Sequence, residues 1–154
     1  MIGLIKTQDQ AVNYIQDKII KDVVKFYDLD YIPNFLIFDL NNKRYSTMNI
    51  VLKDRTIKYI ICFKKEKVHS YGKIYNDEGE GETINKYEFD NNIKDKCERI
   101  IYCYQTPYNT EIKYIYVNLL NRLIENKKAY LHNNNADGKQ QYIFSVRYLQ
   151  DFEV

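Results

Sequence analysis

The central third of the chain carries a period-two alternation of apolar and polar residues, and this pattern constrains the fold more than any other feature. In residues 45–52, apolar side chains take every second position, as expected where successive side chains of a strand point to opposite faces. Residues 35–40 and 57–63 are apolar at nearly every position, which is typical of strands covered on both sides. Short connections containing Asn and Asp favour hairpin turns between them. The expected strands are 35–40, 45–52, 57–63, 67–75, 83–89 and 141–148.

Three other segments have the periodicity of amphipathic helices, with apolar residues at steps of three and four. Residues 8–27 form the first, and helices are also predicted after the possible N-caps at 90–92 and across 110–131. The order of elements predicts an α+β fold of two layers. Its mostly antiparallel sheet of five or six strands would carry the N-terminal helix and the two C-terminal helices on one face. A curved sheet wrapping the first helix is an alternative. The length of 154 residues predicts a single domain over 1–154.

The charge of the whole chain is nearly balanced, at +2 with a pI near 8.3, which is too mild to indicate nucleic acid by itself. Charge is nevertheless segregated along the chain. Seven basic and two acidic side chains lie between Lys53 and Lys73, whereas six acidic and one basic lie between Asn76 and Asp90. Neighbouring patches of opposite sign can steer a partner, although a mixed solvated surface has the same pattern.

Three cysteines, Cys62, Cys97 and Cys103, lack the spacing of a metal site. Their odd number and the absence of a secretory signal predict reduced thiols in a cytoplasmic protein. We expect neither a membrane anchor nor a membrane-spanning helix, since no apolar run approaches the required ~20 residues. Abundant Ile, Asn, Lys and Tyr indicate an AT-rich genome, such as that of a low-GC bacterium, its phage or a large DNA virus.

Sequence motifs for catalysis and for cofactors are missing. The chain contains no HExxH, GxSxG, GxGxxG or GxxxxGK[ST] motif, so we expect no cofactor and no metal site. A Cys–His pair assembled in space remains open. A nuclease-like alternative would use Asp39, Glu82 and Glu88 with Lys73 or Lys86, but the stretch 82–88 lacks a tight E-x-K spacing.

The polar side of the predicted sheet is the strongest candidate for a binding surface, because it interleaves aromatic rings with cations. Such a face suits a protein partner, for which Tyr and Arg are favoured anchors. It also suits a nucleic acid or nucleotide, through stacking and phosphate contacts. An ordinary solvated strand face is the third interpretation, since Tyr favours strands. The predicted binding residues are Tyr45, Asn49, Lys58, His69, Tyr71, Lys73, Tyr75 and Arg147.

An acidic loop follows this surface in the chain and is predicted to be a second contact, able to engage a basic partner. Its residues are Asp77, Glu78, Glu80 and Glu82. The sequence therefore predicts a small cytoplasmic protein that acts by binding another protein rather than by catalysis. It would be an inhibitor or accessory protein encoded by a phage, virus or mobile element. The alternatives are a nucleic-acid or nucleotide binder and a metal-dependent nuclease or hydrolase with a dispersed site.

Overall fold

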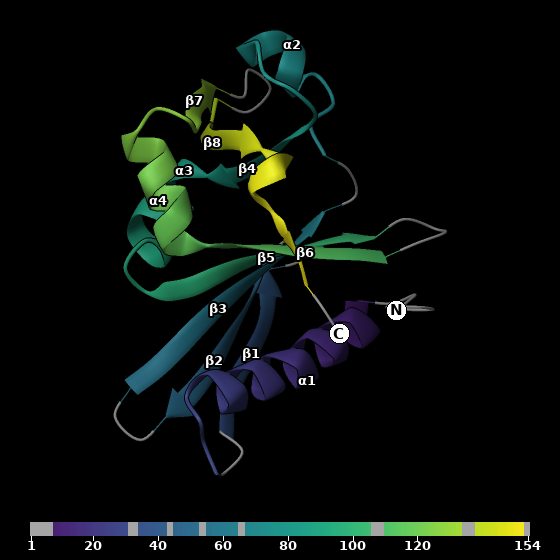
Figure 1. Cartoon of the computed structure of the whole chain (residues 1–154), viewed down its shortest axis with the longest axis vertical. Coiled ribbons are helices and arrows are strands. Elements are labelled where there is room, and N and C mark those ends of the chain that lie inside the picture. Colours follow the sequence, from purple (N-terminus) through teal and green to yellow (C-terminus); the bar gives the residue numbers. More distant parts are fainter. Residues whose placement is uncertain are drawn as a thin grey trace.

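The computed structural model describes residues 8–30, 34–42, 45–52, 55–64, 67–105, 110–133 and 138–152. Within these ranges, it describes only the backbone of residues 8–9, 34–42, 45–52, 55 and 105. The predicted α+β fold with mostly antiparallel strands is confirmed (Figure 1). The helices and turns are α1 (Gln8–Phe26), α2 (Tyr71–Tyr75), α3 (Lys86–Glu88), the π-helical turn η1 (Phe89–Ile93), α4 (Val117–Glu125) and the 3₁₀ turn η2 (Val146–Tyr148). The strands are β1 (Asn34–Asn42), β2 (Tyr45–Leu52), β3 (Arg55–Lys64), β4 (Gly81–Asn85), β5 (Cys97–Gln105), β6 (Thr110–Tyr116), β7 (Tyr130–Asn133), β8 (Gln140–Ser145) and β9 (Gln150–Asp151).

The strands form two sheets rather than the one that the sequence predicted. The first sheet has the order β1-β2-β3-β5-β6-β9, and the second has the order β4-β8-β7. Strands β1, β2 and β3 pair as consecutive antiparallel hairpins, as expected from their alternation. Strands β3 and β5 pair in parallel, whereas every other pairing of named strands is antiparallel.

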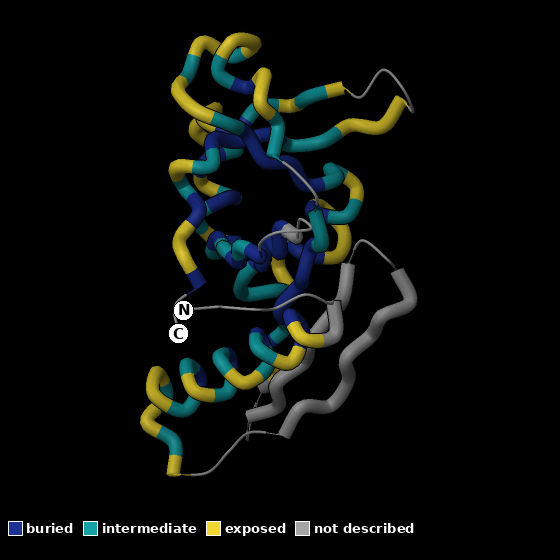
Figure 2. Tube along the Cα trace, turned by 90° about the vertical axis from the view of Figure 1, so that its right-hand side faces the viewer, coloured by how far each residue is buried: buried dark blue, intermediate teal, exposed yellow. Residues whose placement is uncertain are grey.

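The first sheet is covered on both faces, which differs from the predicted arrangement with all helices on one face. One face of β3 and β5 packs against the apolar stripe of α1, including Ile15 and Ile19. The other face packs against β4, β8, η1 and α4, so that α1 and α4 lie on opposite sides (Figure 1). Figure 2 shows the buried positions gathered in the middle of the molecule. The structure thus has three layers where two were expected.

The two predicted C-terminal helices are wrong in large part. The segment 93–104 contributes strand β5, because the side chains of Ile100 and Tyr102 enter one apolar cluster while Ile101 and Cys103 enter the other. A run that is apolar on both faces suits a strand between two layers. The segment 110–131 divides into β6, α4 and the start of β7. In the described helices, none is long and apolar enough to cross a bilayer.

Candidate functional site

The predicted binding residues do not share one sheet face. Tyr45 and Asn49 lie on β2, where Asn49 is paired with Lys58 of β3, but the side chains of Tyr45 and Asn49 fall outside the described residues. The segment 67–75 is not a strand, since most of it forms α2, and Arg147 lies in η2 beside the second sheet. The predicted open face is therefore wrong as a structural unit. The binding role of each residue remains a prediction.

Helix α2 forms because the apolar spacing of 67–75 fits a helical turn as well as a strand. Val68, Tyr71 and Tyr75 follow one another at steps of three and four, and the Ile74 N–H donates to the Ser70 carbonyl over 3.0 Å. The chain turns sharply after the helix. A Cβ atom on Gly72 would lie 2.5 Å from the Asp77 carbonyl oxygen, so a residue without a side chain is needed there.

The structure brings most of the remaining predicted residues together at one end of the molecule, which we call the α2 end. It comprises residues 67–80, β7 and η2, and it lies at the top of Figure 1. Backbone hydrogen bonds attach residues 67–80 to the second sheet: Val68 and Gly81 exchange two, of 2.8 and 2.9 Å, and the Val146 N–H donates to the Glu80 carbonyl over 2.9 Å. The predicted residues that meet here are His69, Tyr71, Lys73, Tyr75, Asp77, Glu78, Glu80 and Arg147.

Tyr71 is the anchor of the α2 end rather than part of its surface. Its side chain is fully buried, although the sequence predicted an exposed ring. A Cβ atom on Gly81 would lie 2.6 Å from Tyr71 Cδ1, which shows how closely the strand passes the ring. Burial and the neighbouring Asp77 raise the pKa of the Tyr71 phenol, so it is a neutral hydrogen-bond donor. Its hydroxyl donates to Asp77 Oδ2 over 3.2 Å.

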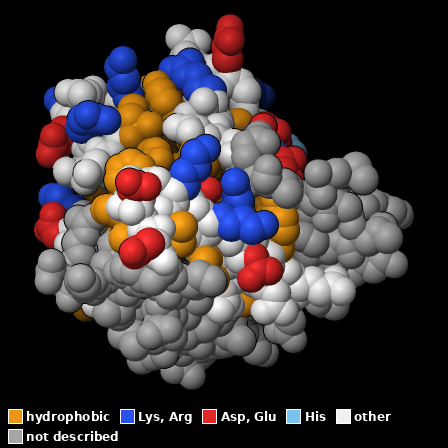
Figure 3. All heavy atoms as spheres, turned by 60° about the horizontal axis from the view of Figure 1, so that its bottom comes forward, with side chains coloured by type: hydrophobic (Ala, Val, Ile, Leu, Met, Phe, Trp, Pro, Cys, Tyr) orange, Lys and Arg blue, Asp and Glu red, His pale blue; other side chains and the backbone are white. Residues whose placement is uncertain are grey.

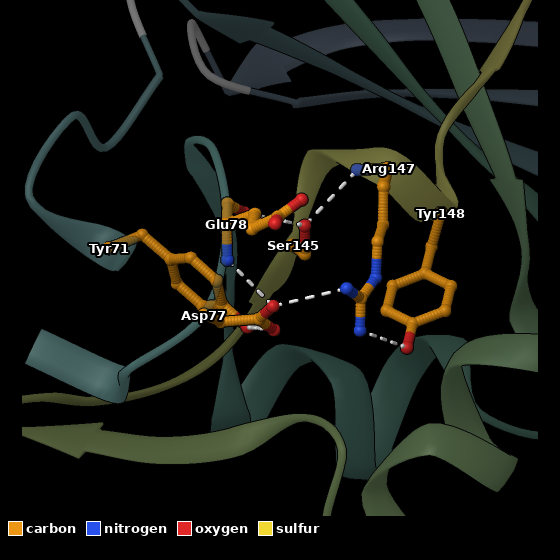
Figure 4. Close-up of polar contacts among 6 residues, drawn as sticks. All are labelled: Tyr71, Asp77, Glu78, Ser145, Arg147 and Tyr148. Carbon is orange, nitrogen blue, oxygen red and sulfur yellow. Dashed lines mark hydrogen bonds and ion pairs between the residues drawn. The ribbon is translucent and has the colours of Figure 1, made fainter. Parts of the chain in front are cut away.

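Asp77 is the centre of a polar network that connects the loop after α2 to η2 (Figure 4). Its Oδ1 accepts from the Glu78 backbone N–H at 2.7 Å and from Arg147 Nη1 at 3.1 Å. The Glu78 N–H, with Tyr71 and Arg147, holds the pKa of the Asp77 carboxyl below its ordinary range. Arg147 Nη2 also donates to the Tyr148 hydroxyl over 3.0 Å. The carboxylate therefore stays ionised and fixes the guanidinium.

A cluster of aromatic rings supports the same end from β7. The rings of Tyr75 and Tyr130 are nearly parallel, with centroids 4.6 Å apart and planes at 12°. The Tyr75 hydroxyl lies 2.6 Å from His132 Nδ1. Sequence reasoning missed Tyr130, His132 and Tyr148 as members of this end. More than fifty positions separate Tyr75 from Tyr130 and His132, so no local pattern could have revealed these contacts. Tyr148 directly follows the predicted Arg147, and this proximity in the chain is the signal that could have found it.

The side chains that the α2 end exposes are of mixed chemistry. Ile74 is 55 % exposed, and it is one of four large apolar side chains that protrude from the described part of the molecule. Lys73 is exposed beside it, and the Arg147 side chain is half-exposed. Elsewhere, on the face in Figure 3, basic and acidic side chains lie interspersed among apolar ones. The α2 end can therefore offer an apolar contact with a cation beside it.

The acidic loop does not form one exposed acidic tip. Asp77 is bonded to Arg147, and Glu80 Oε2 contacts His69 Nδ1. Glu82 is only 1 % exposed and lies on β4 between the two sheets, so it is not a surface contact. The glycine-rich stretch continues into β4, whose first residue, Gly81, passes too close to the Tyr71 ring to carry a side chain. Of the four predicted acids, Glu78 is left facing solvent.

The acids of the nuclease alternative are placed on different elements. Asp39 lies on β1, where side chains fall outside the described residues, and Glu88 lies on α3. Lys86 is paired with Asp90 over 2.6 Å. Across the described residues, no group of three or more His, Cys, Asp or Glu side chains is arranged to hold a metal ion. The three cysteines are free thiols.

Comparison with known proteins assigns no family. No family profile matches the chain, and no curated protein is similar to it in sequence. One solved structure, a nuclease from a fusselovirus, aligns with 96 % of this chain and 89 % of its own length. Its sequence identity is 12 % and its TM-score is 0.48. At these values nothing about the activity of the present chain follows from the likeness.

Proposed function

We propose that the protein acts by binding another protein through the α2 end, without a catalytic step of its own. The observation that carries the proposal is the exposure of Ile74 on the short helix α2, whose first residue is the buried Tyr71. An apolar side chain held on a rigid support loses little conformational entropy on binding. Single exposed apolar residues are common on surfaces, but this one lies in a segment whose backbone is hydrogen-bonded to β4 and η2.

The charges around Ile74 indicate the kind of surface that it fits. Lys73 is exposed next to it in the chain, and Arg147, which is held by Asp77 and Tyr148, is a second cation of the α2 end. Arginine and tyrosine are frequent anchors of protein interfaces. We therefore expect a partner that offers an apolar pocket with carboxylates beside it. The protein would serve as an inhibitor or accessory factor of a phage, virus or mobile element, acting in the cytoplasm.

Affinity purification from the native host with quantitative mass spectrometry tests the proposal. Three tagged chains are compared: wild type, Ile74→Asp, and Phe26→Asp as the matched control. Phe26 is 74 % exposed at the end of α1, so its substitution changes an apolar residue that is more accessible than Ile74 and lies outside the α2 end. We expect one protein to be recovered with wild type and the control, and to be lost with Ile74→Asp. Circular dichroism confirms that each variant is folded.

The same chains and four further variants separate the alternatives. Equal recovery of the partner by Ile74→Asp and wild type would contradict the proposal. So would salt-dependent retention on a random oligonucleotide that disappears in Lys58→Ala, Lys73→Ala and Arg147→Ala, because it would indicate nucleic acid as the partner. Metal-dependent cleavage of DNA or RNA that is lost in Glu82→Gln would replace the proposal with a nuclease.

A further inference from the structure

The second sheet has the strand order β4-β8-β7, and its edge at β4 is occupied. Val68 exchanges two backbone hydrogen bonds with Gly81, of 2.8 and 2.9 Å. Two residues further along β4, the Thr83 N–H donates to Glu82 Oε2 over 2.7 Å, and the Thr83 carbonyl accepts from the Tyr102 hydroxyl over 3.2 Å. The backbone groups that β4 directs away from β8 at these two positions therefore all have partners within the chain.

The hydrogen-bond alternation of antiparallel strands determines which backbone groups β7 directs outward at the opposite edge. The first residue of β4 bonds away from β8, so the next residue of β4 bonds to Phe144 of β8. Its neighbour Ile143 then bonds to the other side, where it is paired with Tyr130 of β7. At the alternate positions of β7, Leu131 and Asn133 consequently direct their N–H and C=O groups away from the sheet.

This outer edge of β7 is open toward the described part of the chain. On that side, neither Leu131 nor Asn133 forms a backbone hydrogen bond with any residue that the structure describes. Strand β7 lies on the side of β8 away from β4 (Figure 1). Leu131 is 50 % exposed, on the opposite face of β7 from the rings of Tyr130 and Tyr75. Unpaired edge groups of this kind can form hydrogen bonds with another strand.

Apart from its short length, β7 lacks the usual features that prevent an edge strand from pairing. Its four residues include no Lys, Arg, Asp, Glu or Pro, and its register with β8 is continuous. Lysine is the side chain most often used to block an edge, and like charges directly opposite each other are destabilising. Two copies of this strand can therefore approach each other without such repulsion.

The spacing of the outward groups also fits a second copy of the same strand. A two-fold axis at His132 pairs Leu131 of each copy with Asn133 of the other, and each such pair exchanges two backbone hydrogen bonds. The outward groups of both residues are then satisfied in both copies. The two Leu131 side chains become diagonal neighbours on one face of the joined sheet, within contact distance for long side chains. Their exposed apolar surface is thereby buried.

We propose that β7 is a self-association edge, through which two copies of the chain pair in antiparallel order and join their second sheets as β4-β8-β7-β7-β8-β4. Because each strand is short, the dimer is weak and reversible. Strand β7 belongs to the α2 end, so the dimer carries two α2 ends and can bind a multivalent partner more tightly than one chain. That consequence rests on the proposed function, whereas the pairing itself concerns the purified chain alone.

Sedimentation equilibrium of the purified chain tests the pairing. From about 10 µM to about 1 mM, the average mass of wild type should rise from that of the monomer, 18.6 kDa, toward twice this value. Asn133→Pro removes an outward N–H but leaves the bonds between β7 and β8 in place, and it should raise the dissociation constant of the dimer about tenfold or more. Asn133→Ala is the matched control, since it keeps the N–H and should change this constant less than about twofold.

Amide hydrogen exchange measured by NMR locates the contact. The amides of Leu131 and Asn133 should exchange more slowly as the concentration rises, whereas that of Ile84 in β4 should stay constant. Leu131→Lys keeps the test decisive if Asn133→Pro does not fold. It changes a half-exposed residue and places two positive charges on neighbouring positions of the joined strands, so it should weaken the dimer to a similar extent.

A monomeric mass at every concentration would overturn the proposal. So would a dimer whose dissociation constant is unchanged in both Asn133→Pro and Leu131→Lys, because the copies would then associate through another surface. If the chain is monomeric and Asn133→Pro, but not Asn133→Ala, loses the protein recovered by affinity purification, the edge belongs to an extended segment of that protein instead. The effect of Ile74→Asp on partner recovery tests the proposed function and leaves the mass measurements unaffected.

Discussion

Lys127→Gly should stabilise the protein, because Lys127 occupies a backbone conformation that suits glycine. Its φ is +58°, in the left-handed region, directly after the C-terminal end of α4. The Lys127 N–H donates to the Ile124 carbonyl over 3.2 Å, and the Lys128 N–H donates to the Leu123 carbonyl over 2.8 Å. This pair of bonds is the Schellman motif, in which the left-handed position is usually glycine.

The expected gain follows from two opposing contributions. Relief of the contact between Cβ and the backbone is worth roughly 1–2 kcal/mol. Glycine also makes the unfolded chain more flexible, which costs about 0.5–1 kcal/mol. The net stabilisation is therefore about 0.5–1 kcal/mol. For a chain of this length, that corresponds to a rise of about 1–4 °C in Tm.

Thermal and urea denaturation of wild type, Lys127→Gly and Lys128→Gly measure the effect. Lys128 is the matched control, since it is exposed like Lys127 and loses the same charge, but it does not have a positive φ. Lys128→Gly should leave the stability unchanged or lower it. If Lys127→Gly were as stable as this control, or less stable, the conformational explanation would be refuted.

Three further predictions concern the α2 end and the thiols. Gly81→Ala places a Cβ atom 2.6 Å from Tyr71 Cδ1 and should destabilise the fold by about 1–3 kcal/mol in urea denaturation; an unchanged midpoint would contradict the close approach. Tyr71→Phe keeps the ring but removes the hydrogen bond to Asp77, so the free energy of unfolding should fall by about 0.5–1.5 kcal/mol in the same assay. A higher free energy of unfolding would argue against that hydrogen bond. Burial raises the pKa of the Cys97 thiol to about 11. At pH 8, iodoacetamide should therefore label Cys97 roughly a hundredfold more slowly in the native chain than in denaturant, as measured by mass spectrometry. Rapid labelling of the native chain would contradict this prediction and show that the thiol is accessible.

The predictable parts of the fold are the segments whose apolar residues repeat with a single period, either that of a helix or that of a strand. Residues 8–27 were expected to form an amphipathic helix, and α1 spans Gln8–Phe26 with Val12, Ile15, Ile19 and Val23 buried on one stripe. Phe26, the last residue of the helix, continues this spacing but is 74 % exposed. The boundaries of β2 match the prediction, since hairpin pairing and alternation act together there.

The failures arise where a short apolar run satisfies two periods at once. Ile93, Cys97, Ile100 and Tyr104 have helical spacing, yet Cys97 and the residues that follow it form β5, because two layers of the fold cover both of its faces. Nothing within residues 97–105 indicates that a second sheet will cover them. Tertiary burial therefore decided the structure over local periodicity.

The candidate site was predictable in composition but not in arrangement. The sequence predicted Tyr75 and Arg147 on one surface and Asp77 in a separate acidic contact, whereas the α2 end contains all three. The predicted structural context of these residues was wrong. A sheet face was expected, whereas helix α2 and the Asp77–Arg147 salt bridge hold these residues in place. The 70 positions between Asp77 and Arg147 leave no spacing from which their contact could be read.

The parallel pairing of β3 with β5 has a consequence for how the chain can be divided. Residues 67–96 lie outside the first sheet and contribute β4 to the second. After β5 and β6 of the first sheet, the chain adds β7 and β8 to the second sheet before β9 pairs with β6 in the first. Strands of the two sheets therefore alternate along the chain, and neither sheet is formed by one continuous segment. We expect one cooperative unfolding transition, and we expect that no proteolytic cut between the sheets releases a fragment able to fold alone.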